Sequence, residues 1–142
     1  DWVPVDWAYA VANHGDNVNV KLMSANDSLV LAWETTALFD TDTDVDVVLS
    51  TFNGTTRSFS DPHPLQPVMR TDSATDQDAS FTKVIVDGVE TLYLLYSTSE
   101  DLTGNSGTDL DIALCTSTDA GATWSSPILI HGDGNDGATD DD

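Results

Sequence analysis

Residues 117–124, S-T-D-A-G-A-T-W, lie between two apolar-rich runs at residues 111–115 and 126–130. The pattern predicts two β-strands joined by a tight turn. Gly121 can adopt a positive φ without a steric cost, which a turn of this kind often requires. The sequence therefore predicts a β-hairpin over residues 111–130.

The turn also contains side chains that can stabilise it. Ser117 and Asp119 can accept hydrogen bonds from turn N–H groups, and Trp124 can bury a large ring beneath the turn. Together with Gly121, these residues resemble the Asp box (bacterial neuraminidase repeat) of sialidase-like β-propellers. The resemblance implies the turn between the third and fourth strands of a blade, at the periphery and away from the catalytic face. It implies architecture more than activity, because the box recurs in sialidases, other glycoside hydrolases, sorting receptors and assembly factors.

The sequence contains an internal repeat. SLVLAWETT at residues 28–36 matches TLYLLYSTS at residues 91–99, which lies 63 residues later. Asp42-Thr43-Asp44 matches Asp109-Leu110-Asp111, which lies 67 residues later. Ser50, Gly54 and Thr56 repeat the spacing of Ser117, Gly121 and Thr123, with Phe52 in place of Asp119 and Arg57 in place of Trp124. A repeat of this size predicts two propeller blades, the first with a degenerate Asp box.

We therefore expect an all-β fold, a β-propeller segment of about two four-stranded blades with an Asp box. Strands are predicted at residues 17–23, 28–34, 44–51, 56–60, 81–86, 91–98, 109–116 and 124–130. The predicted divisions are an N-terminal strand of a neighbouring or closing blade (1–16), blade 1 with the degenerate box (17–60), an inter-blade crossover and loop (61–79), blade 2 with the Asp box (80–130) and an acidic tail or linker (131–142). Three prolines in residues 61–67 predict that no strand pairing occurs there.

The chain length leaves the assembly open. A propeller has roughly four to eight blades, whereas the 142 residues here suffice for about two. The chain is part of a longer protein, or several copies assemble, or it forms an open two-blade structure.

The chain is strongly acidic, with 25 acidic and 4 basic residues and a net charge of −21. This charge disfavours nucleic acid and anionic lipid as partners. It fits a protein adapted to high salt, where the Debye length falls to ~3 Å at 1 M. It also fits a protein that binds divalent cations through carboxylates.

One run of alternating carboxylates is a candidate calcium site: Asp40, Asp42, Asp44 and Asp46. In an extended strand these side chains would face one way, about 6–7 Å apart, and would repel one another. Either a bound Ca²⁺ ion or bulk salt can relieve this repulsion. No other cofactor is expected.

The sequence offers no catalytic residues. Sialidase catalysis would require three arginines around the substrate carboxylate, and only Arg57 and Arg70 are present. The leading hypothesis is a non-catalytic binding or scaffold module, with glycans as a candidate ligand. One alternative is part of a sialidase-like glycoside hydrolase whose catalytic residues lie outside this chain. A second alternative is a structural surface or filament subunit.

Other features suggest an extracellular or cell-surface location. Asn26 and Asn53 begin glycosylation acceptor patterns at predicted turns. No apolar run reaches the ~18 residues of a membrane span. Cys115 is predicted to be a buried structural thiol, and the expected partners are further copies or the rest of a larger propeller.

Overall fold

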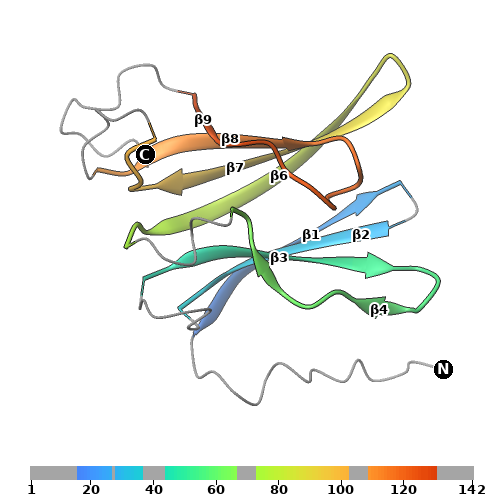
Figure 1. Cartoon of the computed structure of the whole chain (residues 1–142), viewed down its shortest axis with the longest axis horizontal. Helices are drawn as coiled ribbons and strands as arrows, with labels where there is room; N and C mark the ends of the chain where they lie inside the picture. The colour runs from blue at the N-terminus through green and yellow to red at the C-terminus, as the bar shows by residue number, and fades with distance from the viewer. Residues whose placement is uncertain (1–15, 27, 37–43, 67–72, 103–108, 131–142) are drawn as a thin grey trace.

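The computed structural model describes residues 16–26, 28–36, 44–66, 73–102 and 109–130. Within these ranges the chain forms two antiparallel β-sheets and no helix (Figure 1). The all-β prediction is therefore confirmed, while the assignment of the sheets to propeller blades stays a prediction.

The first sheet, sheet 1, contains five strands. They are β1 (Asn17–Ala25), β2 (Ser28–Thr35), β3 (Asp46–Asn53), β4 (Ser58–Phe59) and β5 (His63–Pro64). The order is β1-β2-β3-β4, and β5 also pairs with β3. The first four strands are therefore neighbours in chain order, whereas β5 returns to pair with β3.

The pairing of β5 corrects the prediction that residues 61–67 lack strand pairing. Pro64 lies opposite Val48 in the antiparallel register. Proline cannot donate to a ladder, but the N–H of Leu65 donates to the carbonyl of Val47 at 2.9 Å. A two-residue strand at a sheet edge can therefore include proline, because the next residue supplies the hydrogen bond.

The second sheet, sheet 2, is a four-stranded meander in the order β6-β7-β8-β9. Its strands are β6 (Asp76–Val86), β7 (Val89–Thr98), β8 (Asp111–Ser117) and β9 (Ile128–Leu129). The predicted crossover and loop over residues 61–79 is wrong from Asp76 onward, because β6 begins there and a β-bulge between Gln77 and Ser80 breaks the alternation of its side chains. The predicted strand at 124–130 is assigned as a strand only over β9, although the N–H groups of Ser125 and Ile130 also donate to carbonyls of β8, at 2.8 and 3.0 Å.

The two sheets share this bulge. In sheet 1 it lies between Val18 and Lys21, next to Asn19 at a φ of 55°. In sheet 2 Asp78 has a φ of 57° in the corresponding bulge. Asn and Asp tolerate this left-handed conformation better than most residues. The internal repeat is thus present in the backbone as well as in the sequence.

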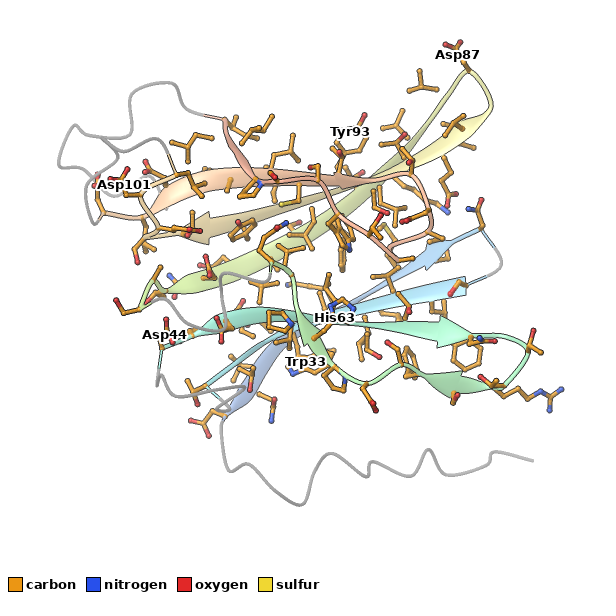
Figure 2. All side chains as sticks on the ribbon, viewed as in Figure 1. Trp33, Asp44, His63, Asp87, Tyr93 and Asp101 are labelled. Carbon is orange, nitrogen blue, oxygen red and sulfur yellow. The ribbon has the colours of Figure 1, made fainter. Side chains whose placement is uncertain are left out.

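The sheets pack face to face around one hydrophobic core (Figure 1). Its buried residues come from both sheets: Ala25, Val30, Ala32, Val47, Leu49, Leu65, Ala79, Leu92, Leu94, Tyr96, Ala113 and Cys115. We call the faces that form this core the inner faces and the opposite faces the outer faces. Trp33 and Tyr93 lie on the outer faces of sheet 1 and sheet 2, respectively (Figure 2).

Candidate functional site

The turn after β8 is stabilised by its own side chains. The Ser117 hydroxyl accepts from the N–H of Gly121 at 2.9 Å and donates to Asp119 at 2.8 Å. The Asp119 carboxylate accepts from the N–H and the hydroxyl of Thr123, at 2.9 and 2.6 Å. The Trp124 indole donates to the Gly121 carbonyl at 3.2 Å. Each of the predicted turn residues is therefore used to hold the turn.

Ionised Asp119 is the form that these hydrogen bonds favour. Partial burial alone would raise the pKa of Asp119. Hydrogen bonds from the hydroxyl and N–H of Thr123 and from the hydroxyl of Ser117 outweigh burial, so the pKa of Asp119 lies below its ordinary value. The carboxylate therefore caps the turn at neutral pH.

The same turn connects the two sheets. Gly121 has a φ of 86°, and a Cβ added there would lie 2.6 Å from the Cγ2 atom of Val30 in β2. The Trp124 ring packs beside Phe81 of β6, with ring centroids 6.0 Å apart. The turn thus packs against sheet 1, and only glycine allows this close approach.

The corresponding turn of sheet 1 is capped differently. The Asn53 side-chain oxygen accepts from the N–H groups of Thr55 and Thr56, at 2.9 and 3.2 Å. Ser50 is buried in β3, and its hydroxyl donates to the carbonyl of Ser60 at 2.7 Å. Gly54 is exposed in the turn. This capping role of Asn53 was not predicted, although an Asx turn at Asn-Gly is a recognisable signal.

The strand register explains the difference. Ser50 lies opposite Leu31, and Cys115 lies opposite Leu94. In the pairing of its sheet, Ser50 therefore occupies the position that Cys115 occupies in sheet 2, two residues before Ser117.

A shallow groove of about 390 Å³ lies between the two turns. Its polar lining includes Ser28, Asn53 and Asp119, with Phe52 as an aromatic neighbour. Ser28 donates to the carbonyl of Phe52, and Asn53 and Asp119 cap their own turns. These three polar groups are already used in hydrogen bonds that hold the turns. We therefore interpret the groove as the space between two adjacent turns.

The predicted calcium ligands fall into two sets. Asp40 and Asp42 lie outside the described residues. Asp44 is half-buried, and Asp46 is buried opposite Thr35. Among the residues that the structure describes, no three His, Cys, Asp or Glu side chains group as metal ligands would. The described half of the run thus provides no site by itself.

Two further aspartates are buried on the inner face of sheet 2. Asp76 and Asp111 lie opposite Thr98 from either side. The N–H of Asp76 donates to the carbonyl of Val45 at 2.7 Å, which connects the start of β6 to sheet 1.

The only cysteine is a buried core residue, as predicted. Burial raises the pKa of Cys115 to about 11, although the hydrogen bond that the Gln66 side chain donates to its sulfur at 3.4 Å opposes this shift. Burial, followed by the nearby charge of Asp76, raises the pKa of Tyr96 far above its ordinary value. Both groups are therefore protonated at neutral pH, and the thiol is unsuited to nucleophilic chemistry.

Polar contacts join the sheets at a second place. The Lys83 ammonium donates to the carbonyl of Ser24 and pairs with Glu90, both at 2.9 Å. Glu90 also accepts from the N–H of Asn26 at 2.7 Å. Hydrogen bonds from Lys83 and Asn26 hold the pKa of Glu90 below its ordinary value. This cluster connects the β6–β7 hairpin to the β1–β2 turn.

The bulge of β6 is also capped from sheet 1. Glu34 accepts from the N–H of Asp78 at 2.7 Å and from the side chain of Asn19 at 2.8 Å. One glutamate thus contacts the bulges of both sheets. No local pattern around Glu34 indicates this role, because it depends on how the sheets stack.

Apolar side chains are exposed in three places. Val18, Val20 and Leu22 lie along β1, Val84, Ile85, Val86 and Val89 at the tip of the β6–β7 hairpin, and Ile128 and Ile130 at β9. The hairpin extends beyond the rest of sheet 2 (Figure 1). These side chains are 46–69% exposed, so they are available to a partner.

No protein-family model matches the chain, and no curated protein matches it. In the described ranges, no helix is long and apolar enough to cross a membrane.

Proposed function

We propose that this chain is a non-catalytic scaffold or binding module of the sialidase-like propeller type. In this proposal its two sheets are consecutive members of a larger stack of sheets. The observation that carries it is the outer face of sheet 2, where the central strands present large apolar side chains.

Strands β7 and β8 are apolar on both faces. In β7, Leu92 and Leu94 face the core, so Tyr93 and Leu95 point to the outer face. An antiparallel sheet with one face in water normally alternates apolar and polar side chains, whereas strands covered on both faces are continuously apolar. The composition of β7 therefore fits a sheet that lies between two others.

Strand β8 has the same character. Its inner positions are Ala113 and Cys115, while Ile112 and Leu114 lie on the outer face and are half-buried. The outer face thus carries side chains at least as large as those of the inner face. A further sheet would remove this apolar surface from water.

The polar residues support a scaffold as well. Ser117, Asp119 and Asn53 hold turns, and Glu34 and Lys83 join the two sheets. Their hydrogen bonds serve the fold. We also propose that the module works in high salt at or outside the cell surface, which the net charge of −21 supports.

Two neighbouring leucines provide the test. Leu94 is fully buried on the inner face, so Leu94→Ala should cost about 2–5 kcal/mol of unfolding free energy. Leu95 is half-buried on the outer face, so Leu95→Ala should cost about 1 kcal/mol or less in the monomer. Denaturant unfolding at low protein concentration measures both. Equal losses would show that the outer face belongs to the chain's own core and would overturn the proposal.

An activity assay separates the module from an enzyme. The purified chain should release no fluorophore from a panel of fluorogenic glycosides, sialosides included. Binding to a glycan without turnover would identify a ligand for the module. Turnover that co-purifies with the chain would instead support a glycoside hydrolase.

A further inference from the structure

This inference rests on the proposed function and names the partner of the outer face. We infer that a second copy of this chain binds there head to tail, placing the outer face of its sheet 1 on the outer face of sheet 2. The strand registers, the shared bulge and the exposed apolar residues carry the inference.

The shared bulge fixes which residues of the two sheets correspond. In sheet 1 it separates the pairs Val18–Glu34 and Lys21–Ala32. In sheet 2 it separates the pairs Gln77–Ser97 and Ser80–Leu95. Position 34 therefore corresponds to 97 and position 32 to 95, the same 63-residue spacing as in the sequence repeat.

Corresponding residues lie on opposite faces. Val30 and Ala32 face the core from sheet 1, whereas their counterparts Tyr93 and Leu95 lie on the outer face of sheet 2. The outer face of sheet 2 is thus the counterpart of a face that, in sheet 1, is already covered by a sheet.

The reverse relation also holds. Leu92 and Leu94 face the core from sheet 2, and their counterparts Leu29 and Leu31 lie on the outer face of sheet 1. The interface inside the chain therefore joins two different faces of the repeat. The outer face of sheet 2 is of the same kind as the inner face of sheet 1. The outer face of sheet 1 is of the same kind as the inner face of sheet 2.

Head-to-tail contact between copies repeats the interface that the chain already contains. The outer face of sheet 2 would receive the face that carries Leu29 and Leu31, just as the inner face of sheet 1 receives the face that carries Leu92 and Leu94. Contacts of this heterologous kind close into rings or continue as filaments.

A polar contact fits the same geometry. Glu34 of sheet 1 accepts from the bulge N–H of Asp78 in sheet 2. The counterpart of Glu34 is Ser97, on the outer face of sheet 2, and the counterpart of Asp78 is Asn19. In the inferred contact, the hydroxyl of Ser97 lies where it can accept from the Asn19 bulge of the second copy.

Both faces have accessible apolar residues. Ile128 lies opposite Leu114 on the outer face of sheet 2 and is 60% exposed. Leu22 lies opposite Leu31 on the outer face of sheet 1 and is also 60% exposed. Each copy carries a charge of −21, so association should strengthen as salt screens the repulsion.

Two variants test the inference, each blocking one face. Ile128→Asp with Leu114→Asp blocks sheet 2, and Leu22→Asp blocks sheet 1. Thr55→Asp, in the exposed β3–β4 turn outside both faces, is the control for the added charge. Masses are measured by light scattering after size exclusion in about 1 M NaCl, where the Debye length is ~3 Å. Circular dichroism checks that each variant is folded, and Ile128→Asp alone is the milder sheet 2 variant.

The wild type and the Thr55→Asp control should assemble, and each blocked variant alone should be monomeric. Loss of one buried apolar side chain should weaken association by about 10- to 100-fold. Mixing the two blocked variants should restore association, but only as a heterodimer, because each retains one intact face of opposite kind. This rescue is specific to head-to-tail contact.

Two results would overturn the inference. One is a dimer formed by Leu22→Asp alone, because it would mean that two sheet 2 faces pair with each other. The other is a folded wild type that is monomeric at every salt and protein concentration. The proposed scaffold function is tested separately, because Leu94→Ala and Leu95→Ala are compared in the monomer. A monomeric wild type in which Leu95→Ala costs little would therefore contradict the contact between copies but not the scaffold function.

Discussion

Replacement of Gly121 by alanine tests how closely the β8 turn packs on sheet 1. The added Cβ would lie 2.6 Å from the Cγ2 atom and 3.3 Å from the Cγ1 atom of Val30, a buried core residue. The backbone of Gly121 also has a φ of 86°, which alanine adopts at a cost. The substitution therefore combines backbone strain with an overlap between the two sheets.

The two contributions have comparable sizes. A left-handed conformation costs a residue with a Cβ about 1–2 kcal/mol. Overpacking a core typically costs about 1–3 kcal/mol. Gly121→Ala should therefore lower the free energy of unfolding by about 2–5 kcal/mol. Much of the stability of a small domain would be lost, since it is about 5–15 kcal/mol in total.

Gly88 provides a matched control. It has a φ of 81° in the β6–β7 turn, and a Cβ there would meet nothing within 4 Å. Gly88→Ala should show the backbone contribution alone. Denaturant unfolding in high salt gives both values, and the difference measures the overlap with Val30.

A double variant separates the overlap further. Val30→Ala creates space, so adding Gly121→Ala to it should cost about as much as Gly88→Ala does. The reasoning is refuted if Gly121→Ala costs no more than Gly88→Ala in the wild-type background. That result would mean that the turn does not pack on β2 as closely as the structure shows.

Three other measurements test single features. Because the pKa of Asp119 is lowered, its ionised form adds stability above about pH 4, and this stability is lost as the pH falls through the folded-state pKa. The difference in Tm between the wild type and Asp119→Ala should therefore shrink in acid. Cys115, with a pKa of about 11, should react with a thiol reagent at pH 8 only as fast as the chain unfolds. Below about 0.1 M NaCl the Tm should fall as screening weakens, and rescue by millimolar Ca²⁺ would contradict salt adaptation as the only cause.

Strand positions were largely predictable because most strands have strong local patterns. The apolar runs of β2 and β7 and the turn residues Ser117 to Trp124 depend on neighbours within a few positions. The start of β6 was missed because its bulge shifts the alternation of side chains, so that a local reading predicts a loop. β5 was missed because its pairing depends on the N–H of Leu65.

Contacts between the sheets could not be predicted from local patterns. The cap that Glu34 provides for Asp78 joins residues 44 positions apart, and its existence depends on the stacking geometry. The same holds for Gly121 and Val30, where the sequence identifies a turn glycine but not the side chain beneath it. The apolar run of β7 does not tell its two faces apart, and only the structure distinguishes its inner from its outer face.

The angle between sheets 1 and 2 determines whether a head-to-tail assembly closes into a ring or stays open. Each added copy contributes two sheets and repeats the same contact, so the rotation per copy is fixed by the fold of the chain. If that rotation divides a full turn, every outer face is covered and the mass stops rising at a closed ring. Two, three or four copies would supply four, six or eight sheets, within the roughly four to eight blades that propellers contain. If the rotation does not close, one outer face stays open at each end, and the mass should rise with protein concentration.

Charge repulsion between copies opposes both outcomes at low salt, because each copy carries a net charge of −21. A ring that persists when the salt is diluted would therefore require that burial of the apolar faces outweighs this repulsion.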